Sequence, residues 1–261
     1  MRLPFKSGAA ATAAKAQQPD PPAIPIVPGA ELAAHYRSAR VGGDFYDFVM
    51  TPSARLLFLL LDIAGKRAEA FDIAAATQEH FRRRGTELFV ETEVNESTAL
   101  TELALDLNRV IMQSAGGVRC SPAFLACYEP GMGTLWYVNA GHTPALLRDQ
   151  QDITLLESNG LPLGLFSHAT HDAQISVLAP GSALLLVSRG VVEARAGGRE
   201  FGMERLRQSI AWPVKSAEQA CTAVLAASEH FVSSSATGKL RLTRGDPYPN
   251  DRTVVALARA T

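Results

Sequence analysis

The sequence predicts an α/β (α+β) protein, folded as a four-layer sandwich in which sheets pack on each other and helices cover the outside. Three observations predict it. Short apolar runs typical of strands mostly follow one another, which disfavours a parallel doubly wound sheet. Two pairs of amphipathic helical patterns interrupt them. The chain has 261 residues, 47% of them hydrophobic, which is enough for one large core.

The first half is predicted to hold one fully covered strand followed by two helices. Residues Leu56–Leu61 have no polar face, so we expect a strand covered on both sides. The stretch from about Glu69 to Arg84 is predicted to be a helix. The segment Thr98–Ser114 has a helical stripe of apolar residues and stops at Gly116.

The second half is predicted to hold six strands in succession, then two helices and a last strand. Two helices are predicted, Met203–Ile210 and a longer one from Ser216 to about Val232, with Ser216 and Gln219 spaced as a capping box. The predicted strands are Ala123–Tyr128, Thr134–Asn139, Ala145–Arg148, Ile153–Glu157, Gln174–Leu178, Ala183–Val187 and Thr253–Leu257.

The N-terminal stretch differs in composition from the rest. The first 28 residues hold six of the 15 prolines. Such a segment buries too little apolar surface to offset its ordering entropy. We therefore expect residues 1–29 to form a flexible tail and residues 30–261 to form one domain.

Charge, hydropathy and cysteine content argue against nucleic-acid binding through bulk charge, a membrane span and a disulfide framework. A net charge of −1 disfavours nucleic-acid binding through bulk charge. No apolar run is long enough to span a membrane, and no signal peptide is evident. Three cysteines without CxxC spacing are expected to be small buried hydrophobes in a reducing, cytoplasmic protein: Cys120, Cys127 and Cys221.

Carboxylates gather beside glycines and at a strand end. Asp44 and Asp47 follow Gly42-Gly43, and Asp62 ends the most apolar strand. Carboxylates from separate strands suit Mg²⁺ or Mn²⁺. Alternatively, Asp62 caps the following helix and Asp44 closes a turn. Nucleophile-elbow, dinucleotide, Walker and HExxH motifs are absent from the sequence.

Eight segments together resemble the bacterial PPM (PP2C-like) serine/threonine phosphatases of the SpoIIE/RsbU type. The resemblance covers about residues 30 to 260. The segments, in family order, are Val41–Asp47, Asp62–Lys66, Thr134–His142, Leu161–Leu165, Pro180-Gly181, Gly190–Arg195, Phe201–Leu206 and Asp251–Val255.

The resemblance implies two mainly antiparallel sheets packed face to face, flanked by helices, with two metal ions at one end. These metals activate a water molecule that attacks phosphoserine or phosphothreonine directly. Asp44 would bind the second metal, Asp62 would bridge both metals, and the Ile63 carbonyl would complete the second site.

The sequence departs from the family at the first metal. Arg189 replaces the aspartate of a Thr-Asp-Gly turn, and Asn250 replaces the first aspartate of a closing pair, leaving Asp251. Asn250 is a weaker, uncharged ligand. Arg67 also stands where the family has glycine. Two like unit charges about 4 Å apart repel each other by about 4 kcal/mol at an effective dielectric near 20, and a dication doubles that repulsion.

We expect the Arg189 guanidinium to take the first-metal position and to pair with Asp62 and Asp44. The alternative is that Arg189 turns to solvent and leaves the position vacant. Even without metal ions, Arg189, Lys66 and Arg67 would still face a phosphate-sized site.

Two functions follow from these departures. The first is a pseudophosphatase in partner-switching signalling that binds a phosphoprotein without hydrolysing it. Its expected partner is a STAS-type anti-anti-sigma factor or an anti-sigma kinase, with a homo-oligomer left open. The alternative is an active or weakly active phosphatase with Mn²⁺ or Mg²⁺ at one reduced site formed by Asp44, Asp62 and Asp251. A function unrelated to phosphoproteins is a third interpretation.

Overall fold

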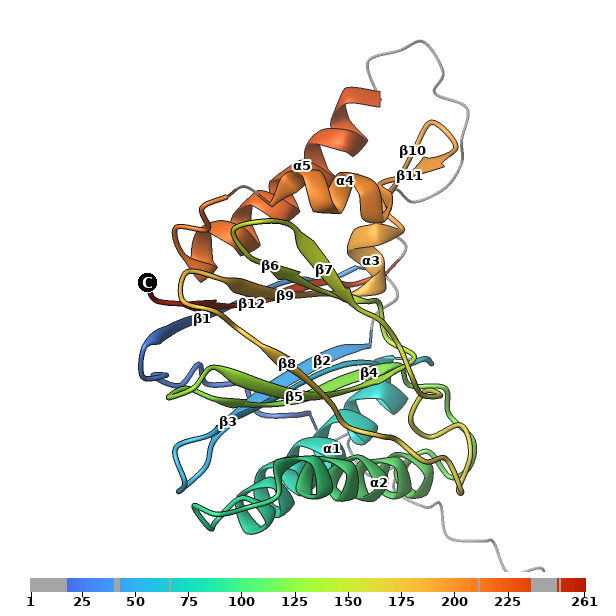
Figure 1. Cartoon of the computed structure of the whole chain (residues 1–261). Coiled ribbons are helices and arrows are strands. Elements are labelled where there is room, and N and C mark those ends of the chain that lie inside the picture. The colour runs from blue at the N-terminus through green and yellow to red at the C-terminus, as the bar shows by residue number, and fades with distance from the viewer. Residues whose placement is uncertain (1–17, 40–42, 66, 211, 236–247, 249) are drawn as a thin grey trace, which may run out of the picture.

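The computed structural model describes residues 18–39, 43–65, 67–210, 212–235, 248 and 250–261. Two five-stranded sheets lie face to face, with one pair of helices outside each sheet (Figure 1). The predicted four-layer sandwich is confirmed, and the paired strands of both sheets are antiparallel.

The first sheet lies against helices α1 (Arg67–Leu88) and α2 (Glu96–Ser114). Its strand order is β2-β3-β4-β5-β8. The strands are β2 (Asp44–Met50), β3 (Leu56–Asp62), β4 (Ala123–Glu129), β5 (Thr134–Ala140) and β8 (Gln174–Val177).

The second sheet lies against helices α4 (Gly202–Ser209) and α5 (Ala217–Ser235), in the order β1-β12-β9-β6-β7. Its strands are β1 (Ala30–Arg37), β6 (Ala145–Arg148), β7 (Ile153–Leu156), β9 (Ala183–Val187) and β12 (Arg252–Arg259). Short helix α3 (Arg189–Val192) and hairpin β10 (Arg195–Ala196) and β11 (Arg199–Glu200) follow β9.

Strand β3 links two of the three cores, as its unbroken apolar run predicts. Leu57, Leu59 and Leu61 pack toward α1 and α2, whereas Leu56, Phe58 and Leu60 pack between the sheets. Successive side chains of a strand point to opposite faces, so both faces of β3 are covered. A third core lies between the second sheet and α4 with α5.

Some expectations need correction or completion. Cys127 and Cys221 are buried, but Cys120 is exposed. Strands β1 and β2 were not predicted. Strand β1 is rich in alanine, which is uncommon in strands. Strand β2 carries the fully buried Asp47, so its buried positions do not follow a pattern of apolar residues alternating with polar ones. At the start of α5, the Ser216 hydroxyl accepts the Gln219 amide at 3.0 Å, as the capping motif predicts.

The predicted tail lies partly within the described residues. Residues 1–17 fall outside them. Val27, inside the predicted tail, is buried with the residues between the two sheets. The division at residues 29 and 30 stays a prediction.

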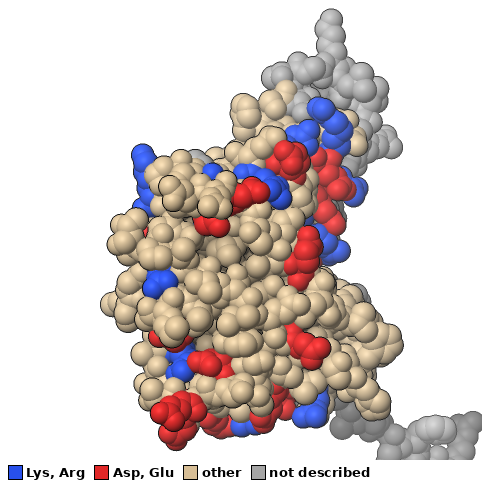
Figure 2. All heavy atoms as spheres, viewed as in Figure 1, with Lys and Arg blue, Asp and Glu red and all other residues tan. Residues whose placement is uncertain are grey.

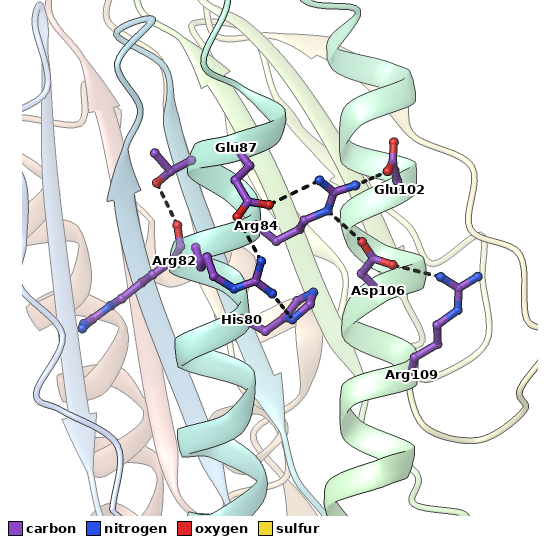
Figure 3. Close-up of polar contacts among 9 residues, drawn as sticks. His80, Arg82, Arg84, Glu87, Glu102, Asp106 and Arg109 are labelled. Carbon is purple, nitrogen blue, oxygen red and sulfur yellow. Dashed lines mark hydrogen bonds and ion pairs between the residues drawn. The ribbon is translucent and has the colours of Figure 1, made fainter.

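An ion-pair network joins helices α1 and α2, which cover the first sheet (Figure 3). Arg84 of α1 contacts Glu102 and Asp106 of α2 as well as Glu87 of its own helix. Asp106 also accepts from Arg109 at 3.0 Å. Exposed pairs contribute little singly, so the network mainly fixes how α1 lies on α2.

Charges of both signs mix on the surface. On the face in Figure 2, blue and red side chains intersperse around the rim while the middle is largely uncharged. Arg195 of β10, for example, pairs with Glu200 of β11 at 2.9 Å. Within the part of the chain that the structure describes, no helix is long and apolar enough to cross a membrane.

Two glycines allow backbones to meet at one end of the sandwich. A Cβ atom on Gly43 would lie 2.0 Å from the Ile63 carbonyl oxygen, and one on Gly190 would lie 2.0 Å from the Asp251 carbonyl oxygen. Both neighbours are backbone atoms that cannot rotate away. These positions therefore require glycine.

We predict that Gly190→Ala lowers the free energy of unfolding by about 1–3 kcal/mol, the usual cost of overpacking. Urea denaturation of the variant and the wild type would measure the difference. Gly131→Ala is the control, since its Cβ would meet only the movable end of Glu129. Equal loss in both variants would contradict the close approach.

Burial lowers the pKa of His142 to about 4. Its Nε2 atom is buried without a hydrogen-bond partner among the described residues, and Nδ1 lies 3.1 Å from the Thr143 carbonyl oxygen. The folded state thus favours the neutral ring. This stabilisation is complete above the unfolded pKa of about 6.5 and is lost as pH falls toward 4.

We predict that the wild type loses about 2 kcal/mol more stability between pH 7 and pH 5 than His142→Gln does. Urea midpoints at the two pH values would show it. His230→Gln removes an exposed histidine and is the control. A wild-type pH slope equal to that of His142→Gln would refute the assignment.

Candidate metal and phosphate site

The candidate residues meet where β2 begins, β3 ends and β12 begins. Asp44 and Asp62 lie directly opposite each other on the paired strands β2 and β3. Asp251 immediately precedes β12, and Arg189 begins α3, on the right in Figure 1. Segments separated by more than 200 residues of sequence thus converge at one end of the sheets.

Arg189 pairs with Asp62, as predicted from the sequence. Its Nε atom lies 3.2 Å from Asp62 Oδ2. The Asp62 side chain is mostly buried, whereas that of Arg189 is half exposed. Burial raises the pKa of Asp62, and the positive charge of Arg189 opposes that rise. The guanidinium therefore supplies positive charge to a carboxylate that the interior would otherwise penalise.

Glu193 joins this pair from the end of α3. Its Oε1 lies 4.0 Å from Arg189 Nε, and its Oε2 accepts a 3.3 Å hydrogen bond from Asn250 Nδ2. The Arg189 side chain thus lies between the carboxylates of Asp62 and Glu193. The Asn250 amide donates to Glu193, which leaves its carbonyl oxygen as the group that can ligate a cation.

Asp44 is held by hydroxyl groups, and the predicted pairing with Arg189 is not among its contacts. Its Oδ2 accepts a 2.6 Å hydrogen bond from Thr253. Burial raises the pKa of Asp44 to about 8, opposed by the hydroxyls of Ser188 and Thr253 and reinforced by Asp62 and Asp251. Near neutral pH, this carboxyl therefore needs a nearby cation to be mainly ionised.

Asp251 is oriented by β1 and the residues that follow it. Tyr36 donates its hydroxyl to Asp251 Oδ2 at 2.8 Å, and the Ala39 amide donates to Oδ1 at 2.6 Å. The Ser188 hydroxyl donates to the Asp251 carbonyl at 3.2 Å and accepts the Thr253 amide at 2.9 Å. The connection into β12 is thereby fixed against the end of β9.

Arg119 secures the loop after Asp62. One guanidinium nitrogen donates to the Ala64 carbonyl at 3.2 Å, and another donates to Glu69 at 3.1 Å. The Ile63 amide donates to the Gly43 carbonyl at 2.9 Å. The Ile63 backbone, whose carbonyl is a predicted ligand, is therefore held on both sides.

Of the residues predicted to face phosphate, the structure describes the side chain of Arg189 but not those of Lys66 and Arg67. Lys66 lies outside the described residues, and so does the side chain of Arg67, the first residue of α1. Of the three cations predicted to face phosphate, Arg189 alone has described contacts.

The donor atoms fit a metal ion unequally at the two positions. At the second position, Asp44, Asp62 and the Ile63 carbonyl offer oxygen ligands that a hard dication prefers. At the first position, Asp62 carries the Arg189 guanidinium, and Asn250 adds no charge. With a guanidinium on its carboxylate and only an uncharged amide beside it, the first position does not fit a dication. Among the described residues, no three acidic, histidine or cysteine side chains are arranged to hold a metal ion at either position.

Sequence reasoning missed Glu193, Tyr36, Thr253 and Arg119. Glu193 lies four residues after Arg189, a spacing that faces it on a helix, so it carried a local signal. Tyr36 and Asp251 are 215 residues apart, and Arg119 and Ala64 are 55 apart. No local pattern marks such contacts.

Solved structures and curated proteins resemble the chain along most of its length. The structure of the RsbU and RsbW domains of Rv1364c from Mycobacterium tuberculosis matches with a TM-score of 0.69 at 24% identity, covering 91% of this chain and 63% of that one. The SpoIIE PP2C phosphatase domain from Bacillus subtilis matches with a TM-score of 0.66 at 16% identity, covering 88% and 62%. These likenesses show the fold.

Curated relatives are longer than this chain. Phosphoserine phosphatase RsbU of Bacillus subtilis is 28% identical over 158 residues, 60% of this chain and 44% of RsbU. Protein IcfG of Synechocystis is 26% identical over 216 residues, 73% of this chain and 33% of IcfG. The matched regions thus span less than half of these relatives.

The family model described as Stage II sporulation protein E (SpoIIE) matches residues 52–259. That range includes Asp62, Arg189, Glu193 and Asp251, together with both sheets except β1 and β2. The chain belongs to the SpoIIE family and has its PP2C-like fold.

Proposed function

We propose that this chain is a pseudophosphatase domain that binds a phosphoprotein without hydrolysing it. The observation that supports this proposal most strongly is the 3.2 Å contact between Arg189 Nε and Asp62 Oδ2. In a two-metal centre, bound cations activate the attacking water. Here a guanidinium lies beside the carboxylate that would bridge those cations.

Electrostatics support this proposal. A dication at the first position must displace Arg189 or accept its repulsion, and Asp62 would be the only remaining anionic ligand from the predicted set. Glu193 adds a carboxylate nearby, but that carboxylate already faces Arg189 and Asn250. A guanidinium between two carboxylates is a stable arrangement that needs no metal.

The proposed partner is a phosphoprotein of a partner-switching pathway. RsbU and RsbP, which this chain resembles, are named phosphoserine phosphatases, and the similar mycobacterial structure contains an RsbW domain beside its RsbU domain. We propose a STAS-type protein or an anti-sigma kinase as partner, in the cytoplasm. Arg189, half exposed, is available to contact a phosphate or an acidic side chain.

One observation favours a second function, an active or weakly active phosphatase. Asp44 and Asp62 remain paired across β2 and β3 at the second position, where Mn²⁺ or Mg²⁺ would bind. In that case Asp251 would supply a third carboxylate after its bonds to Tyr36 and Ala39 rearrange.

We predict that Arg189→Asp/Asn250→Asp binds Mn²⁺ at least about tenfold more tightly than the wild type, because it removes one positive charge and adds two carboxylates at the first position. Isothermal titration calorimetry would measure affinity and stoichiometry. Arg199→Asp/Asn159→Asp makes the same charge change at exposed positions and is the control. Two wild-type sites as tight as those of the double variant would contradict the proposal.

We predict negligible wild-type turnover of p-nitrophenyl phosphate with excess Mn²⁺, since Arg189 and Asn250 replace two of the three expected first-metal ligands. Absorbance of released p-nitrophenol would follow the reaction. Asp62→Asn controls for contaminating phosphatases. Robust wild-type turnover that Asp62→Asn abolishes would favour the active phosphatase over the pseudophosphatase.

A further inference from the structure

A short proline-flanked segment crosses α1 beside the candidate site. Residues 19–22 read Pro-Asp-Pro-Pro, so Asp20 carries their only backbone amide hydrogen. The Asp20 amide donates to Gln78 Oε1 at 2.8 Å, and Gln78 Nε2 donates to the Asp20 carbonyl at 2.9 Å. One glutamine side chain thus pairs with both main-chain groups of one residue, as a neighbouring strand would.

The glutamine is placed for this contact. Gln78 is 4% exposed while both polar atoms of its side-chain amide pair with Asp20. Four residues further along α1, Arg82 holds the buried Asp47 with hydrogen bonds of 2.7 and 3.1 Å. Its remaining terminal nitrogen lies 3.5 Å from Asp20 Oδ2. Gln78 therefore binds main-chain groups of the segment, and Arg82 attracts its acidic side chain.

The segment borders a cavity that reaches the candidate site. A cavity of about 310 Å³ is lined on one side by residues 19–22 and on the other by Tyr36, Asp44 and Phe71, among others. A smaller adjoining cavity includes Pro19, Asp44 and Asp251. Residues 19–22 thus form part of the wall of a cavity that reaches Asp44.

The contacts of the segment suit exchange rather than permanent attachment. The Asp20 side chain is 80% exposed, and its 3.5 Å approach to Arg82 is long for a charged hydrogen bond. Exposed ion pairs of this kind add little stability. Proline-flanked segments are already extended when free, so a competing segment of the same kind binds with a small loss of entropy.

We propose that residues 19–22 form a displaceable strap, and that the groove it occupies binds an extended, acidic, proline-flanked segment of a partner protein. The chemistry of the strap defines that of its competitor: an acidic residue for Arg82, main-chain groups for Gln78, and prolines at the cavity that Tyr36 and Phe71 also line. The inference rests on the proposed function in one respect, that the partner is a protein that approaches Asp44.

The Asp20 amide reports on the strap directly. In the full chain labelled with ¹⁵N-aspartate, hydrogen exchange at Asp20 is expected to accelerate at least tenfold in Gln78→Leu and to stay unchanged in Gln208→Leu, which alters a helical glutamine of α4. Melting temperatures confirm that both variants fold. An unchanged rate of amide hydrogen exchange at Asp20 in a folded Gln78→Leu variant would contradict the proposal that residues 19–22 form a strap held by Gln78.

Competition tests the groove. A fluorescent peptide with the sequence of residues 17–24 is added to the wild type and to Asp20→Pro, which removes the donor to Gln78 from the chain's own strap. We expect anisotropy to show at least fivefold tighter binding by Asp20→Pro, and the peptide to accelerate Asp20 exchange in the wild type. A peptide with the aspartate changed to alanine should bind more weakly.

Equal affinity of wild type and Asp20→Pro for the peptide, or no binding to either, would overturn the groove. These assays contain neither metal nor phosphate ester. Their failure would therefore leave the pseudophosphatase proposal standing, and loss of that proposal through measured turnover would leave the strap standing.

Discussion

Three carboxylates at one end of a pair of sheets must each find a compensating group, and this requirement organises the whole site. Burial and the neighbouring carboxylates of Asp62 and Asp251 raise the pKa of Asp44, and burial and Asp251 raise the pKa of Asp62. Bound metal ions would offset this cost of ionisation. Among the described residues, Asp62 pairs with Arg189, Asp44 accepts a hydrogen bond from the Thr253 hydroxyl, and Asp251 accepts from the Tyr36 hydroxyl and the Ala39 amide.

The fold makes that arrangement possible by bringing distant segments together. Antiparallel pairing sets Asp44 opposite Asp62, and pairing of β12 with β1 and β9 brings Asp251 near Tyr36 and Ser188. Gly43 and Gly190 permit backbone contacts that a Cβ atom would forbid. The geometry of the site is thus a property of both sheets and of the short α3, whose first residue is Arg189.

Much of the fold could be predicted because its signals are local. The apolar run of β3 and the helical stripe of α2 are visible in sequence, whereas β1 and β2 are obscured by alanines and by a buried aspartate. For the site, the pairing of Arg189 with Asp62 could be predicted because a family pattern places both residues. The partners of Asp44 and Asp251 could not, since Thr253 and Tyr36 reach them from more than 200 residues away.

The central claim is that a guanidinium has taken the place of a metal ion. A crystal of the wild type soaked in Mn²⁺, with diffraction recorded near the manganese absorption edge, tests it most directly. The account predicts Arg189 density against Asp62 and no anomalous peak between Asp62 and Asn250. A manganese peak at that position, with Arg189 turned to solvent, would contradict it.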